Sequence, residues 1–138
     1  MYLIDTNVIS ELRKRDRANP GVLAFFRQAE NSEAALYLSA VTVGELRRGV
    51  ELIRHRGDAL QADSLEAWLT SVLTDFARSI LPIDHDVSQV WGRLRVPHPE
   101  HALDKLIAAT ALIHGLTVVT RNVDDFSGCR VPVLNPFN

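Results

Sequence analysis

Four of the 17 acidic residues in this chain of 138 residues each lie near the end of a predicted strand or in a predicted helix beside it. They are Asp5, Glu45, Asp104 and Asp125. Carboxylate oxygens are hard ligands that suit Mg²⁺ and Mn²⁺, and several carboxylates held together stay ionised only with cations among them. If the fold brings these four together, they predict a metal site that polarises a phosphodiester and activates water for its hydrolysis.

Three of these acids also have a simpler interpretation when each is considered alone. Asp5 directly follows the apolar residues 2–4 and precedes a helical pattern, where aspartate is a favoured N-cap. Glu45 lies three residues before Arg48, a helical spacing at which an ion pair contributes about 0.2–0.5 kcal/mol. Asp125 is unremarkable as a loop residue. These alternatives stay open as long as the residues are taken singly.

Asp104 is the most informative of the four, because it shares a face with small apolar residues. In the predicted helix 102–114, helical spacing places it with Ile107, Ala108 and Ala111. An acid in the first turn of a helix gains about 0.3–1 kcal/mol from the helix dipole. The dipole does not explain an acid on the inward side, where an unpaired carboxylate is costly. We therefore interpret Asp104 as a functional residue.

The hydrophobic pattern predicts five strands separated by helices. The predicted strands are 2–4, 36–39, 80–83, 116–120 and 131–134, and the predicted helices are 8–15, 21–29, 41–56, 58–77, 85–95 and 102–114. This alternation is typical of an α/β fold with a mostly parallel central sheet of about five strands and helices on both faces. Ligands bind such sheets at the carboxyl ends of the strands, and the four acids converge there.

Composition indicates one globular domain spanning residues 1–138. Hydrophobic residues make up 46% of the chain, charged residues 23%, and the net charge is −2, which excludes binding to nucleic acid through overall basic charge. Cys129 is the single cysteine, so no internal disulfide forms, as in a reducing cytoplasm. No apolar run approaches the roughly 20 residues that cross a bilayer. We expect a cytoplasmic protein with no membrane span.

Basic side chains gather in two groups despite the acidic net charge. The first holds Arg13, Lys14, Arg15 and Arg17, and the second holds Arg47, Arg48, Arg54 and Arg56. Arginine suits phosphate contacts, but solvated helix faces explain each group equally well. Arg121 is predicted at the rim beside the acids, where it either meets a phosphate or offsets the acidic charge. His98 and His101 lack two further ligands for zinc, so we expect a loop leading into a helix.

Four motifs, in order along the chain, resemble those of the PIN-domain ribonucleases, in particular the VapC-like and FitB-like toxins of bacterial toxin–antitoxin pairs. The motifs are YLIDTNVISEL, LSAVTVGELRRGV, HALDKLIAATALIHGLTVVTRNVDDF and VPVLNPF. Each is a modest signal alone, but together they span almost the full length. The resemblance implies an endoribonuclease that uses Mg²⁺ or Mn²⁺ to cut structured RNA such as tRNA or rRNA.

The same resemblance implies partners. A cognate VapB-like antitoxin would block the site, the chain would form a homodimer, and DNA would be bound only through the toxin–antitoxin complex.

The resemblance also assigns roles to individual residues. Asp5, Glu45 and Asp104 correspond to the three central acids. The fourth acidic place falls in TRNVDDF, where we expect Asp125 to be the acid and Asn122 a neutral contributor, with the choice between them open. Thr6 and Thr120 match small hydroxyl residues beside the acids, and Ser39 is expected to act similarly.

Other classes with acids at strand ends fit less well. A receiver domain needs an acidic pair after its first strand and a late lysine, and an aspartyl phosphatase needs D-x-D where this chain has DTN. No P-loop motif is present. A DNA-cutting relative uses the same metal chemistry and stays open. The four intact acidic positions speak against a scaffold that keeps the fold without catalysis.

Overall fold

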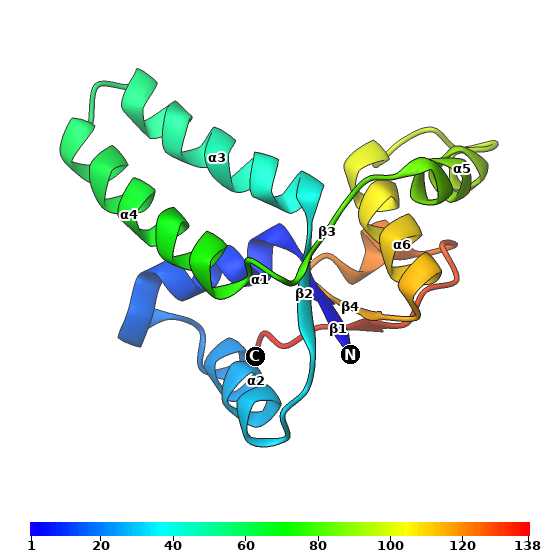
Figure 1. Cartoon of the computed structure of the whole chain (residues 1–138), viewed down its shortest axis with the longest axis horizontal. Helices are drawn as coiled ribbons and strands as arrows, with labels where there is room; N and C mark the ends of the chain where they lie inside the picture. Colours follow the sequence, from blue (N-terminus) through cyan, green and yellow to red (C-terminus); the bar gives the residue numbers. More distant parts are fainter.

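Five short parallel strands form the centre of the molecule in the computed structural model, which describes residues 1–138. They are β1 (Tyr2–Ile4), β2 (Leu36–Ser39), β3 (Ile80–Leu81), β4 (Thr117–Val119) and β5 (Val133–Leu134). Their order in the sheet is β3-β2-β1-β4-β5, and every neighbouring pair is parallel. The predicted α/β fold is confirmed, and all carboxyl ends of the strands meet at one edge of the sheet (Figure 1).

Six α-helices and two 3₁₀ segments connect these strands. The helices are α1 (Thr6–Glu11), α2 (Pro20–Asn31), α3 (Ala40–His55), α4 (Ala59–Asp75), α5 (His85–Leu94) and α6 (Ala102–His114), and the 3₁₀ segments are η1 (Leu12–Arg17) and η2 (Val123–Phe126). The first helix is shorter than predicted at its end, because the chain passes into η1 and Arg15 adopts a positive φ of 55°. The strand predicted at 80–83 stops at Leu81, since Pro82 has no N–H for the ladder.

Side chains alternate across the sheet and bury a core on each face. On β1, Leu3 packs with α6 residues such as Ile107, whereas Ile4 packs with residues of α1, α2, α3 and α4 such as Leu46 and Leu69. Figure 1 shows the same division, with the α3–α4 hairpin on one side and α5 and α6 on the other. The prediction of helices on both faces is therefore confirmed, and the sheet edge lies between two packed layers.

Ion pairs join the two helices of the α3–α4 hairpin. Glu66 of α4 lies 2.7 Å from Arg47 and 3.1 Å from Arg54, both on α3. Arg54 also lies 3.0 Å from Asp63 and 3.3 Å from Glu51. These two arginines of the second basic group are thus bound to acids of the chain itself. No helix of the structure combines the length and the apolar character that a membrane span needs.

Candidate active site

Asp5 is the most deeply buried of the four predicted acids, with 3% of its surface exposed. It directly follows β1, and its Oδ1 accepts a hydrogen bond from the Thr6 backbone N–H at 2.8 Å, which caps α1. Its Oδ2 accepts from the Thr120 hydroxyl at 2.7 Å and from the Asn7 amide at 3.3 Å. Asp5 is therefore the predicted N-cap, and its second oxygen is positioned by residues from both ends of the chain.

Glu45 is connected to the end of β1 through Thr6. The Thr6 hydroxyl donates to Glu45 Oε1 at 2.7 Å and lies 3.3 Å from the hydroxyl of Thr42, which is fully buried. The alternative ion pair between Glu45 and Arg48 does not form. The glutamate is thus oriented by a hydroxyl group beside Asp5 and carries no compensating cation.

Asp104 and Asp125 lie near these two acids, in the first turn of α6 and in η2 respectively. Burial raises the pKa of Asp104 to about 6, and the negative charges of Asp5, Asp125 and Glu45 contribute further. The pKa of Asp5 is also raised, mainly by burial, with Glu45 adding to it. The charges of Asp5, Asp125 and Glu45 all act on Asp104, so the fold brings the four predicted residues together. We call Asp5, Glu45, Asp104 and Asp125 the carboxylate cluster.

The donor chemistry of the carboxylate cluster fits a hard divalent cation. No lysine or arginine forms an ion pair with any of its four members, although eight ion pairs occur elsewhere in the chain. Only the imidazole of His101 comes within ion-pair distance of the cluster, at Asp104 and Asp125. Unpaired carboxylates in a partly buried site repel one another and raise one another's pKa values. A divalent ion bound by oxygen ligands would remove that repulsion.

The predicted supporting residues have different surroundings. Thr120 is fully buried, donates to Asp5 and accepts from the Asn122 backbone N–H at 3.0 Å. Ser39 is also buried, but its hydroxyl caps α3 by accepting from the Val41 N–H at 3.2 Å and bonds to none of the acids. The Asn122 side chain is exposed and makes no hydrogen bond. Of the two residues left open for the fourth place, only Asp125 has a charge that acts on Asp104.

Arg121 does not offset the charge of the carboxylate cluster. Its guanidinium lies over the ring of Phe137, 4.8 Å from the ring centroid, and forms no ion pair with the four acids. Its charge acts elsewhere: the hydrogen bond from Lys14 is the main cause of the lowered pKa of Glu11, and the charge of Arg121 adds to it. One of the two roles predicted for Arg121 is therefore wrong, because the C-terminal aromatic residue holds the side chain. Contact with a phosphate stays a prediction.

Two residues near the cluster were missed in the sequence. The Asn7 side-chain amide donates to Asp5, and its Oδ1 accepts from the Arg121 backbone N–H at 3.0 Å, so Asn7 joins the ends of β1 and β4. His101 lies in the predicted loop before α6, but its Nδ1 is 3.8 Å from both Asp104 and Asp125. A signal for His101 existed, because it precedes Asp104 by three residues, close to one helical turn.

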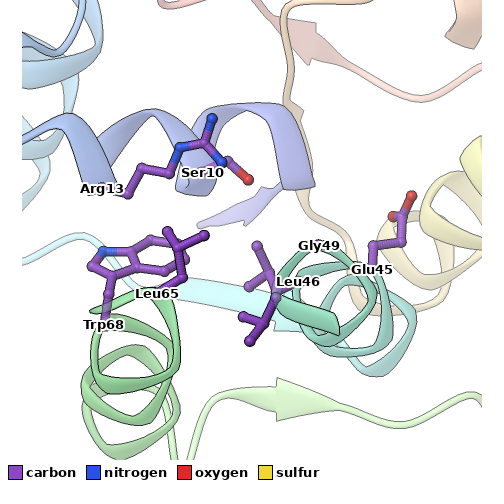
Figure 2. A pocket seen from close by; sticks show the side chains of 8 residues that line it. Ser10, Arg13, Glu45, Leu46, Gly49, Leu65 and Trp68 are labelled. Carbon is purple, nitrogen blue, oxygen red and sulfur yellow. The ribbon is translucent and has the colours of Figure 1, made fainter. Parts of the chain in front are cut away.

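A partly apolar groove begins at Glu45 and runs between α1, η1, α3 and α4. It is lined by Ser10, Arg13, Glu45, Leu46, Gly49, Val50, Leu65 and Trp68. Figure 2 shows Leu65 and Trp68 facing the helix that carries Ser10, with Glu45 at the far end of the α3 side. The Arg13 guanidinium lies above the Trp68 indole in this view. The groove thus extends from the indole of Trp68 to Glu45, a member of the carboxylate cluster.

Comparison with known proteins agrees with this geometry. The family model described as PIN domain matches residues 2–128, so this chain belongs to the PIN-domain family. The chain is 39% identical to the protein named Toxin FitB of Neisseria gonorrhoeae, over 100% of this chain and 99% of that one. It is 37% identical to VapC ribonuclease Y4jK of Sinorhizobium fredii, over 99% and 98%. The structure of FitAB bound to an IR36 DNA fragment matches with a TM-score of 0.78 at 36% identity, covering 100% of this chain and 96% of that one.

Proposed function

We propose that this chain is a metal-dependent endoribonuclease, the toxin of a bacterial toxin–antitoxin pair. The observation that carries the proposal is the carboxylate cluster itself: four acids from four separate segments meet at the carboxyl edge of the sheet, and no lysine or arginine pairs with any of them. The relatives named as a toxin and as a ribonuclease support this assignment. The proposed cofactor is Mg²⁺ or Mn²⁺, held by Asp5, Glu45, Asp104 and Asp125.

The chain's own residues hold these ligands in place for catalysis. When bound, a divalent ion polarises the scissile phosphodiester and activates water for attack on phosphorus. Thr120 and the Thr6 N–H each donate to one oxygen of Asp5, while the Thr6 hydroxyl orients Glu45. Such outer contacts fix the direction of each ligand, and their removal typically weakens metal binding about 10- to 100-fold. No covalent intermediate on the protein is proposed.

Structured RNA such as tRNA or rRNA is the proposed substrate. The first basic group supplies the electrostatic attraction, because Arg13, Arg15 and Arg17 are exposed and form no ion pair with the chain's own acids. Lys14, in contrast, is paired with Glu11 at 2.9 Å. Basic side chains outside an acidic site draw in the polymer backbone, while bound cations reduce the repulsion within it.

A VapB-like antitoxin is the proposed partner, with a contact in the groove of Figure 2, where an inserted segment would reach Glu45. DNA is proposed to bind only to the toxin–antitoxin complex, since this chain is acidic overall and the FitAB structure contains a DNA fragment.

We also propose that the chain forms a homodimer in the cytoplasm. The exposed Leu103, Leu112 and Ile113 of α6 offer apolar surface for self-association, which light scattering on a size-exclusion column would measure.

Cleavage of a mixed pool of tRNA and rRNA fragments tests the proposed activity. The isolated chain is incubated with Mg²⁺ or Mn²⁺ and separately with EDTA, beside an Asp104→Asn variant purified in the same way. Cleavage that requires the ion and falls about 100-fold or more in the variant is the expected result, since misplacing the reacting groups has costs of this size. A single-stranded and a duplex DNA of matched length run in parallel.

The contradicting outcomes of this experiment are distinct. Equal cutting by the variant identifies a contaminating nuclease and removes the support for activity. Cutting of DNA in preference to RNA overturns the proposed substrate while leaving the chemistry. Absence of cutting by folded, antitoxin-free protein on all polymers favours the scaffold alternative.

The role of the groove as the antitoxin contact can be tested separately with substitutions at two glycines. A side chain added at Gly49 meets nothing within 4 Å, so Gly49→Arg should fold while obstructing the groove. Gly92 of α5 is equally open but lies outside the groove, which makes Gly92→Arg the matched control. Pull-down of the co-expressed antitoxin should be lost for Gly49→Arg and kept for Gly92→Arg. Equal capture by both variants would exclude the groove as the contact.

A further inference from the structure

His101 faces two members of the carboxylate cluster without bonding to either. Its Nδ1 lies 3.8 Å from Asp104 Oδ2 and 3.8 Å from Asp125 Oδ1, beyond hydrogen-bond distance in both cases. One ligand atom from each of these three residues lies within 4.8 Å of the other two. Of the five histidines, His101 alone comes within ion-pair distance of the carboxylate cluster.

These separations match ligands of one ion better than a direct contact. Two atoms that are each about 2.1 Å from a shared ion lie at most about 4.2 Å apart. Both separations of 3.8 Å fall below that limit. Each carboxylate therefore lies near enough to the imidazole nitrogen to share a cation with it, and the three ligand atoms all lie within 4.8 Å of one another.

The loop that carries His101 is held in place by contacts outside the cluster. The Trp91 indole N–H donates to the Ala102 carbonyl at 2.9 Å, and Arg95 Nε donates to the Pro99 carbonyl at 3.3 Å. The buried Lys105 ammonium donates to the His98 carbonyl. Three side chains thus hold the backbone on both sides of His101, so its approach to Asp104 does not depend on a free loop.

We propose that His101 is a nitrogen ligand of the divalent ion held by Asp104 and Asp125, and that it makes the site select Mn²⁺ over Mg²⁺. The inference rests on the metal site of the proposed function. Mg²⁺ takes oxygen ligands and keeps several of its waters, whereas imidazole is a good ligand for first-row transition ions. A site made of carboxylates alone would lack the preference for Mn²⁺ that the His101 imidazole supplies.

Pulsed electron paramagnetic resonance with Mn²⁺ as the probe tests the proposal without measuring activity. The chain is prepared with natural and with ¹⁵N-labelled histidine, and the nitrogen coupling to Mn²⁺ is recorded. His101→Gly removes the imidazole while suiting a backbone φ of 56°. His98→Gly, in the same loop and well exposed, is the matched control. Mn²⁺ and Mg²⁺ dissociation constants are measured for all three proteins by calorimetry and competition.

The expected result is a histidine nitrogen coupling in the wild type and in His98→Gly that is absent in His101→Gly. The Mn²⁺ dissociation constant should rise about tenfold or more in His101→Gly, with a much smaller change for Mg²⁺. Bound Mn²⁺ without nitrogen coupling in the wild type overturns the His101 assignment and leaves the carboxylate site standing, even if His101→Gly does not fold. Wild-type protein that binds no Mn²⁺ at all overturns both this inference and the proposed metal site.

Discussion

The α3–α4 hairpin and the carboxylate cluster are both dense in charge, but their charges are arranged in opposite ways. In the hairpin, Arg47 and Arg54 contact Glu51, Asp63 and Glu66, and all five side chains are accessible to solvent. In the cluster, four acids of one sign lie together, one of them almost fully buried, with no arginine or lysine to pair with.

This difference separates charges that support the fold from charges that work against it. Exposed ion pairs contribute little to stability, because water already solvates both partners. Partly buried acids of like charge cost stability, and groups with such shifted pKa values are concentrated at functional sites. Four changes to the chain or its solution test this comparison.

Acidification should have the largest effect, by releasing the divalent ion from the carboxylate cluster. The pKa of Asp104 is raised to about 6, so below that pH a proton competes with the ion for this carboxylate. We expect the Mn²⁺ affinity measured by calorimetry to fall by up to about tenfold per pH unit below pH 6. The Asp104→Asn variant should bind more weakly at neutral pH but show a flatter profile. A flat profile in the wild type would contradict this assignment of the ligand.

Removal of the Thr120 hydroxyl should come next. Thr120→Val keeps the shape of the side chain but deprives Asp5 Oδ2 of its 2.7 Å hydrogen bond. Mn²⁺ affinity is expected to fall about tenfold, the usual size for loss of a group that orients a ligand. Thr110→Val is the control, because Thr110 is equally buried but donates to the Leu106 carbonyl. Equal losses in the two variants would indicate a general packing effect.

Neutralising Asp104 should stabilise the metal-free protein. Its pKa in the fold lies above 3.8, so ionising it costs stability as the pH rises from about 4 to about 6, and the full cost applies above that range. Allowing for solvent screening, Asp104→Asn should raise the free energy of unfolding by about 1–2 kcal/mol at pH 7.5. The difference from wild type should disappear near pH 4. Urea denaturation in EDTA at both pH values measures it, and a loss of stability at pH 7.5 would refute the cost assigned to burial of the Asp104 charge beside the other acids.

A change in the hairpin should have the smallest effect. Glu66→Gln removes the acid shared by Arg47 and Arg54, yet these side chains are accessible to solvent and distinct from the carboxylate cluster. RNA cleavage and Mn²⁺ affinity should equal those of the wild type, and the urea midpoint should move less than in Asp104→Asn. A large loss of cleavage would show that the hairpin charges contribute to the site after all.

The main features of the carboxylate cluster are predictable from the chain because they depend on local rules. Strand ends follow from apolar runs and the breaks after them, and parallel strands place those ends at one edge. Asp5 and Asp104 could therefore be assigned to the same place, although 99 positions separate them in the numbering. Helix spacing likewise showed that Asp104 is on the inward face of α6.

Other features depend on contacts that no local pattern contains. Arg121 lies over Phe137 because β5 brings the C-terminal residues back beside β4. Arg47 and Arg54 find acids because α4 folds back on α3. His101 reaches Asp125 because α6 and η2 pack together. In each case the contact of a flexible side chain depends on which neighbours the packed fold places around it.

The sequence by itself therefore determined the α/β fold, the edge of the sheet that matters and three of the acids that gather there, since strand and helix periodicity is a property of short segments. The tertiary structure alone decided which charges are neutralised and which are not. That distinction depends on distances of a few ångströms between segments far apart in the chain, and at those distances burial and neighbouring charge set whether a carboxylate is a stable surface group or an available ligand.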